Sequence, residues 1–226
     1  MKNFIFDLYN TLIRIHTDEY REETWQPVAR FFRERGIEAD ALTLRALYGE
    51  GWNNAIAEHE REKKFKYPEC DIVEIFRAMV SKTGAEASYE ICEEAVKCMR
   101  RASRVEFSTF DGTLELFLKL KACGAKIYLL SNAQAAFTYD EIEECGLLNR
   151  FDGMLLSSEY GCRKPDPAFF KILFDKYGLD KRDSVMVGDD KESDGKGAKA
   201  FGIKFVCAEG GAALLTDKLV RLAQSK

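Results

Sequence analysis

The feature that most constrains the fold of this sequence is a repeated alternation of short apolar runs with stretches of helical periodicity. Five apolar runs occupy residues 3–8, 126–130, 154–156, 184–187 and 203–206. From residue 126 onward, helix-period sequence separates each run from the next, which is typical of a parallel sheet covered by helices. Glycines stand where the helices should end, at Gly124, Gly146, Gly178 and Gly202. The pattern predicts an α/β fold.

The sequence between the first run and Phe107 lacks this alternation and instead carries four amphipathic stripes at helical spacing. The stripes lie at residues 25–32, 42–48, 72–80 and 89–99, the last after a candidate cap at Ser88. Stripes of this kind usually pack helices together and do not contact ligands. We expect an α-helical cap of residues 15–103, inserted into a core made of residues 1–14 and 104–226.

Composition narrows the class of protein. At 226 residues the chain suits one large domain or a core with an insert. Its 34 Lys and Arg against 38 Asp and Glu argue against nucleic acid or an anionic membrane as the main partner. The seven cysteines are scattered and never spaced as Cys-x-x-Cys, and no apolar stretch has the length of a membrane span. We expect reduced thiols and a cytoplasmic location.

Polar residues follow several of the predicted strands. Asp7 ends the first run, Ser131 and Asn132 follow the second, and Asp189 follows the fourth. Lys164 lies between the third and fourth runs. Because ligands bind outside the carboxyl ends of parallel strands, these groups should meet at one edge of the sheet. Carboxylates suit Mg²⁺, while an ammonium group and hydroxyls suit a phosphate.

Taken together, these segments resemble four motifs of the haloacid dehalogenase-like hydrolase superfamily. The motifs lie in the family's order, at residues 6–12, 129–132, 163–167 and 187–194. The resemblance covers the core from residue 3 to about residue 208. It implies a Rossmann-like three-layer sandwich with a helical cap, in which the five strands, numbered along the chain, lie in the order 5-4-1-2-3.

The resemblance also implies roles for individual residues. Asp7 would be a nucleophile that forms an aspartyl-phosphate, and Lys164 would supply a fixed positive charge. Mg²⁺ would be held by Asp7, the main-chain carbonyl of Tyr9 and Asp189. Thr11, Ser131 and the amide of Asn132 would hold the oxygens of a small phosphorylated substrate. Asp194, with Asp190 beside it, would orient Lys164 or a water on the ion.

Tyr9 departs from the phosphatase pattern. Phosphatases of the family place an aspartate two residues after the nucleophile to protonate the leaving group, and such help is worth about 10² to 10⁴ in rate. A tyrosine there resembles the 2-haloacid dehalogenase branch, in which the aspartate attacks carbon without a metal. Asp189 and Asp190 favour Mg²⁺-dependent phosphoryl transfer, because unneutralised carboxylates would repel a haloacid.

Two further alternatives stay open. A substrate with a good leaving group, such as an acyl phosphate, would need no acid at Tyr9. The scaffold would otherwise serve as a weakly catalytic binding or regulatory module.

A second Asp-Gly-Thr sequence, at residues 111–113, imitates the first motif. We expect it to begin a helix with no strand before it, because Glu106, Ser108 and Thr109 interrupt the apolar pattern.

Overall fold

A computed structural model describes residues 1–225, apart from the side chains of residues 59, 60 and 62. Its main sheet has five strands, β1 (Asn3–Phe6), β4 (Lys126–Ser131), β5 (Gly153–Leu156), β6 (Ser184–Gly188) and β7 (Lys204–Cys207). The order across the sheet is β5-β4-β1-β6-β7, and all neighbours are parallel. When only the strands of this sheet are numbered along the chain, the order is 3-2-1-4-5, which is the predicted order 5-4-1-2-3 read from the other edge. The labels differ because β2 and β3 belong to another sheet.

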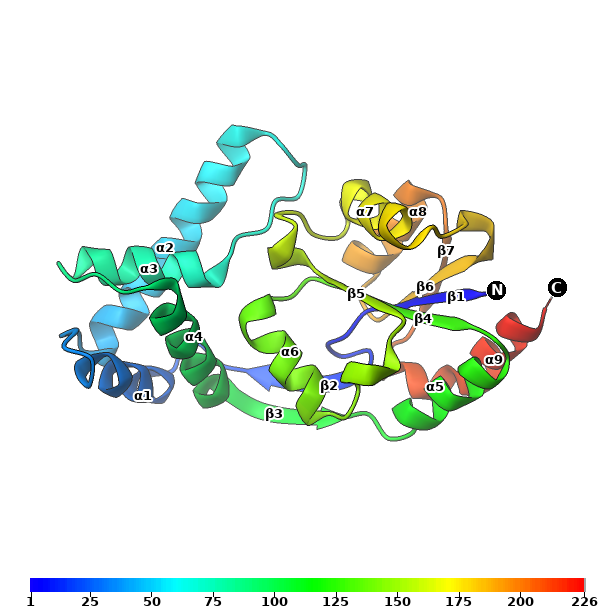
Figure 1. Cartoon of the computed structure of the whole chain (residues 1–226), viewed down its shortest axis with the longest axis horizontal. Coiled ribbons are helices and arrows are strands. Elements are labelled where there is room, and N and C mark those ends of the chain that lie inside the picture. Colours follow the sequence, from blue (N-terminus) through cyan, green and yellow to red (C-terminus); the bar gives the residue numbers. More distant parts are fainter. Residues whose placement is uncertain (226) are drawn as a thin grey trace.

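Helices cover both faces of the main sheet, so this part of the molecule has three layers (Figure 1). One face is covered by α5 (Thr113–Ala122), α6 (Ala135–Glu144) and α9 (Thr216–Gln224), and the other by α7 (Pro167–Tyr177) and α8 (Lys196–Phe201). Alternate residues of β1 point to opposite faces: Phe4 and Phe6 pack with Phe117, while Ile5 packs with Phe169. The predicted α/β class is confirmed.

Short turns of helix complete the core. They are 3₁₀ turns at Leu148–Arg150, Ser157–Glu159, Lys181–Asp183 and Ala212–Leu215, and one π-helical turn at Lys191–Gly195.

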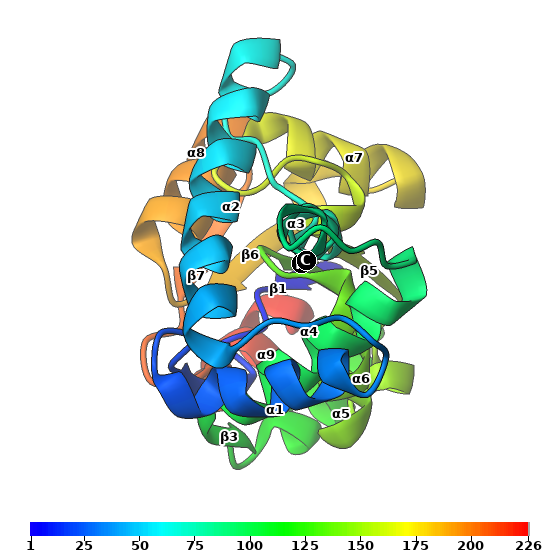
Figure 2. The same ribbon diagram turned by 90° about the vertical axis from the view of Figure 1, so that its left-hand side faces the viewer.

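The four predicted helical stripes form four helices that pack on one another (Figure 2). They are α1 (Glu22–Arg33), α2 (Ala41–Glu62), α3 (Ile72–Lys82) and α4 (Tyr89–Ser103). Their buried side chains, including Trp25, Phe76 and Val96, make a separate apolar cluster. Ser88 caps α4 as predicted, because its Oγ accepts a hydrogen bond from the N–H of Ile91. We call residues 22–103 the helical unit.

The expectation that no strand precedes Phe110 is wrong. Strand β3 (Arg104–Thr109) pairs antiparallel with β2 (Ile13–Thr17) in a two-stranded sheet of its own. A narrow ribbon with solvent on much of its surface does not need a continuous apolar face, which explains why the polar residues of β3 hid the strand. The chain therefore enters and leaves the helical unit on two paired strands.

The connection between α2 and α3 returns to the core. The N–H groups of Lys66 and Tyr67 donate to the Asp166 carboxylate over 2.9 and 3.2 Å, and the N–H of Arg163 donates to the Tyr67 carbonyl over 3.0 Å. The side chain of Gln134 donates to the Cys70 carbonyl. The helical unit is thus attached to the core at a second place, away from β2 and β3.

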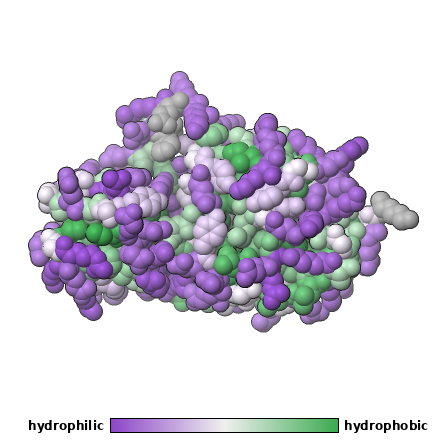
Figure 3. All heavy atoms as spheres, in the orientation of Figure 1, coloured by the Kyte–Doolittle hydropathy of each residue, from purple (hydrophilic) through white to green (hydrophobic). Residues whose placement is uncertain are grey.

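Charged and polar side chains cover most of the face shown in Figure 3, with apolar areas in small separate patches. Among the residues that the structure describes, none of the helices combines the length and apolarity needed to cross a bilayer. None of the cysteines that the structure describes is joined in a disulfide.

Candidate active site

Three carboxylates and one ammonium group meet at the carboxyl edge of the main sheet. Oxygens of Asp7, Asp189 and Asp194 all lie within 4.8 Å of one another. The Nζ of Lys164 lies 2.6 Å from Oδ1 of Asp7 and 2.7 Å from Oδ1 of Asp194. We call these four residues the acidic site. The parallel sheet assembles it, because Asp7 follows β1 and Asp189 follows the neighbouring β6.

Lys164 is held in place through its main chain as well as its side chain. Asn132 accepts a hydrogen bond from the Lys164 N–H over 2.8 Å and donates one to its carbonyl over 3.0 Å. The ammonium group is buried. Burial by itself lowers the pKa of Lys164, but Asp194 and Asp7 outweigh it and raise that pKa above its usual value. Lys164 is therefore a fixed positive charge.

Asp194 approaches β6 so closely that glycine is required there. A Cβ on Gly188 would lie 2.0 Å from Oδ2 of Asp194. The same oxygen accepts a hydrogen bond from the Asp190 N–H over 3.3 Å. Burial and the nearby Asp7 raise the pKa of Asp194 to about 7, although Lys164 opposes the shift. Asp190 itself is exposed, and its carboxylate caps the following π-helical turn.

Thr11 and Ser131 donate hydrogen bonds to the carboxylates. Thr11 Oγ1 lies 2.9 Å from Oδ1 of Asp189 and 3.5 Å from Oδ2 of Asp7, and Ser131 Oγ lies 3.3 Å from Oδ1 of Asp7. Thr11 and Asn132 are predicted to hold substrate oxygens, yet the Thr11 hydroxyl and the Asn132 side chain are engaged with protein groups. Burial raises the pKa of Asp189, and Asp7 adds to the increase while Thr11 opposes it.

The acidic site fits a hard divalent cation. Its three carboxylates face a single ammonium group, so negative charge is in excess. Oδ1 of Asp194 is buried and accepts no hydrogen bond of good geometry, although it lies beside the Lys164 ammonium group. Carboxylate oxygens are the ligands that Mg²⁺ prefers. The residues present therefore match the implied ion.

Tyr9 does not point toward the other groups of the acidic site. Its hydroxyl donates a short hydrogen bond to Oε2 of Glu141 and shares another with Thr138 over 3.0 Å, both on α6. Burial, reinforced by the Glu141 charge, raises the pKa of Tyr9 well above its usual value. The tyrosine hydroxyl is therefore not placed to protonate a leaving group. Sequence reasoning missed Glu141, which resembles any surface acid of a helix.

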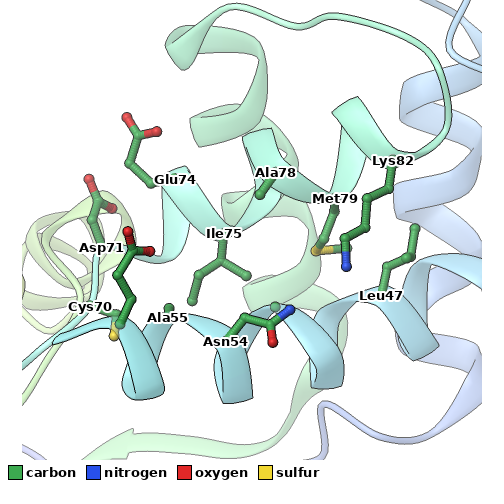
Figure 4. Close-up of a pocket in the computed structure, with 12 residues that line it drawn as sticks. Leu47, Asn54, Ala55, Cys70, Asp71, Glu74, Ile75, Ala78, Met79 and Lys82 are labelled. Atoms are coloured by element: carbon green, nitrogen blue, oxygen red, sulfur yellow. The ribbon is translucent and has the colours of Figure 1, made fainter. Parts of the chain in front are cut away.

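Two cavities lie in different places relative to these residues. An open cleft of ≈ 720 Å³ borders Asp189, with Asn10, Arg14 and Glu209 among its lining residues. A smaller cavity of ≈ 320 Å³ lies between α2 and α3 inside the helical unit and is lined mainly by apolar side chains such as Ile75 and Met79 (Figure 4). None of the predicted site residues lines the second cavity. The cleft beside Asp189 is the one that adjoins the acidic site.

Comparison with known proteins agrees with this geometry. A family model described as haloacid dehalogenase-like hydrolase matches residues 1–202. The chain belongs to the haloacid dehalogenase-like hydrolase family. The expected resemblance is confirmed.

Curated relatives include several phosphatases. A glyceraldehyde 3-phosphate phosphatase of Methanopyrus kandleri is 23% identical over 203 residues, which is 90% of this chain and 82% of that protein. A phosphoserine phosphatase of Thermus thermophilus is 25% identical over 139 residues, which is 61% of this chain. The chain spans about half the length of the Thermus protein, 54%.

Solved structures of both chemical branches share the fold. A 2-haloacid dehalogenase from Pseudomonas syringae pv. Tomato matches with a TM-score of 0.63 and 17% identity. A HAD phosphatase from Thermococcus onnurineus matches with a TM-score of 0.53 and 19% identity. Each match covers 92% of this chain and 86% of the other. At these identities the likeness shows the fold and does not choose between the two reactions.

Proposed function

We propose that this hydrolase is a Mg²⁺-dependent phosphatase that acts on a small phosphorylated metabolite through an aspartyl-phosphate on Asp7. The observation that carries the proposal is the grouping of the Asp7, Asp189 and Asp194 carboxylates, with Lys164 paired to Asp7 and Asp194. Three carboxylates would repel an anionic substrate, and a divalent cation removes that obstacle. The phosphatases among the curated relatives support the same reaction.

The ion would be held by Asp7, Asp189 and the main-chain carbonyl of Tyr9, with Asp194 next to them. When bound, it supplies positive charge against which a carboxylate can approach a phosphate. Thr11 would hold Asp189 in position, because its hydroxyl bridges the two carboxylates over 2.9 and 3.5 Å. Asp190 would not contact the ion; its N–H would hold the Asp194 carboxylate in position.

An oxygen of Asp7 would attack phosphorus, forming an O–P bond while the bond to the leaving oxygen breaks with its electron pair. Lys164 and Ser131 both contact Oδ1 of Asp7, over 2.6 and 3.3 Å, and would keep the carboxylate oriented. Water would then attack phosphorus, releasing phosphate and regenerating Asp7. The Asn132 side chain would keep Lys164 in register throughout, since it brackets the lysine main chain.

The position of the Tyr9 side chain narrows the class of substrate that we expect. Its hydroxyl is committed to Glu141, so no acid stands two residues after Asp7. Substrates whose leaving group departs without a proton, such as acyl phosphates, should therefore be favoured over alkyl esters. We further propose that residues 15–103 act as a cap over the acidic site and select small substrates.

The test compares three substrates with Mg²⁺ and with chelator: p-nitrophenyl phosphate, acetyl phosphate and 2-chloropropionate. Metal-dependent phosphate release by the wild type, absent in Asp7→Asn, is the expected result. Asp7→Asn keeps the size of the side chain and removes the nucleophile. Chelator-resistant chloride release would reject the phosphatase proposal.

A 2-haloacid dehalogenase is the second candidate, and Tyr9 is the observation that favours it. Halide needs no proton to leave, so the absence of an acid at position 9 is harmless in that reaction. Failure to turn over any of the three substrates would instead favour a binding or regulatory role for the scaffold.

A further inference from the structure

A second buried cluster of charges lies next to the acidic site and has the opposite composition. Glu141 of α6 is fully buried, and its carboxylate accepts hydrogen bonds from Arg100 of α4 and Arg104 of β3. Arg100 donates to it through Nε over 2.7 Å and through Nη2 over 3.2 Å. Arg104 adds donors at 3.0 and 3.2 Å. We call Tyr9, Glu141, Arg100 and Arg104 the arginine joint.

The arginine joint brings three parts of the molecule together. Arg100 belongs to α4 of the helical unit, Glu141 to α6 of the core, and Tyr9 to the loop that follows Asp7. The Arg100 guanidinium also lies over the rings of Phe137 and Tyr9, at 4.5 and 5.2 Å from their centroids. A displacement of α4 would therefore act directly on the side chain of Tyr9.

Fixing the Tyr9 side chain also fixes the main chain of its loop. The loop is tight: the N–H groups of Leu12 and Ile13 both donate to the Leu8 carbonyl, over 2.7 and 3.0 Å. Asn10 adopts a φ of 59°, a conformation that few residues other than glycine and asparagine accept. Because these hydrogen bonds leave the turn little freedom, anchoring the Tyr9 side chain restrains the main chain of the loop, to which the Tyr9 carbonyl belongs.

We propose that Tyr9, Glu141 and Arg100 form a positioning triad that sets the loop between Asp7 and Thr11, and with it the affinity for a divalent ion, according to how the helical unit is docked. The inference rests on the proposed function, because it assumes that the Tyr9 carbonyl contacts the ion. Groups that orient a ligand from behind are typically worth about 10- to 100-fold in metal affinity. The triad also explains why tyrosine occupies position 9.

The experiment measures metal binding without turnover. Free Mn²⁺ is titrated by electron paramagnetic resonance against wild type, Tyr9→Phe and Glu141→Gln, and Mg²⁺ is then added as a competitor. We expect both variants to bind Mn²⁺ about 10- to 100-fold more weakly than wild type. In acetyl phosphate hydrolysis, the Mg²⁺ concentration for half-maximal rate should rise by a similar factor, while kcat at saturating Mg²⁺ falls much less.

Asp140→Asn is the matched control. Asp140 also joins α6 to α4, through Lys97 at 3.4 Å, and is not part of the contacts around Tyr9. Its Mn²⁺ affinity should equal that of wild type. An equal loss in this control would show that any weakening of the interface lowers affinity, and would overturn the triad.

Two results distinguish failure of the positioning triad from failure of the proposed phosphatase function. If wild type binds Mn²⁺ and folded Tyr9→Phe binds it equally well, the triad has no positioning role while the phosphatase proposal stands. If wild type itself binds no divalent ion, the metal-dependent function fails and the triad fails with it. Tyr9→Phe deletes one oxygen only, so it remains decisive if Glu141→Gln does not fold.

Discussion

The acidic site and the arginine joint are neighbouring buried clusters built from the same kinds of charge in opposite proportions. The acidic site sets three carboxylates against one ammonium group, and Oδ1 of Asp194 is left without a well-aligned donor. At the buried centre of the joint two guanidinium groups face one carboxylate, and both Glu141 oxygens accept hydrogen bonds. Glu19 and Glu144 pair with the same arginines from less buried positions. An excess of acceptors can bind a cation, whereas a carboxylate supplied with donors on both oxygens holds helices together. The acidic site is therefore suited to bind an ion, and the joint is suited to hold the surrounding elements in place.

The largest effect should come from removing the one cation of the acidic site. Lys164→Met leaves Asp7 and Asp194 facing each other in a buried place, and should lower kcat for acetyl phosphate by about 10²- to 10³-fold. Steady-state phosphate release at saturating Mg²⁺ measures it. A decrease of only a few fold would show that the lysine is not needed to neutralise the carboxylates.

Removing the one carboxylate of the joint should act on stability instead. Glu141→Leu removes the buried carboxylate that both arginines share, leaving Arg104 only Glu144 at 2.8 Å and Arg100 only Glu19 at 3.7 Å. The free energy of unfolding should fall by about 3–5 kcal/mol. Urea denaturation of this variant beside Asp140→Asn provides the comparison, because the Asp140 carboxylate is exposed and its loss should cost about 0–1 kcal/mol. Similar losses in the two proteins would mean that the joint is no stronger than a surface ion pair.

The free energy of unfolding should depend on pH through Asp194 of the acidic site, and we expect an effect of intermediate size. This test leaves Tyr9 and the arginines of the joint unchanged. The raised pKa of Asp194, about 7, means that the folded protein keeps a proton that the unfolded chain releases near pH 4. Stability contributed by this group should therefore fall as pH rises from about 4 to about 7. Urea titrations in chelator should show this slope in wild type and a shallower one in Asp194→Asn. Identical slopes would contradict the assignment.

The smallest effect is expected at the edge of the joint. Thr138→Val removes one partner of the Tyr9 hydroxyl and leaves its bond to Glu141, so the free energy of unfolding should fall by about 0.5–1.5 kcal/mol. Thermal unfolding with Mn²⁺ present and absent measures it. A loss larger than that of Glu141→Leu would place the centre of the joint at Thr138.

The acidic site was predictable and the joint was not, for a physical reason. Asp7, Ser131 and Asp189 each follow or end an apolar strand, and parallel strands bring such positions together whatever the loops do. Glu141 and Arg100 meet only because two amphipathic helices cross at one angle, and no local pattern records that crossing. The fold shows the same contrast, since the buried strands were clear while β3, half-exposed, was hidden by its polar residues.

The pairing of β2 with β3 determines which part of this protein could be replaced by another segment. Thr17 and Arg104 are partners across the ribbon, so the segment between them starts and finishes at nearly one point. Evolution or protein engineering could replace that segment with a shorter or longer one without changing the path of the rest of the chain. Arg104 would stay on Glu141, but the donors of Arg100 would be lost with the segment, so a replacement would have to supply equivalent donors to that buried acid.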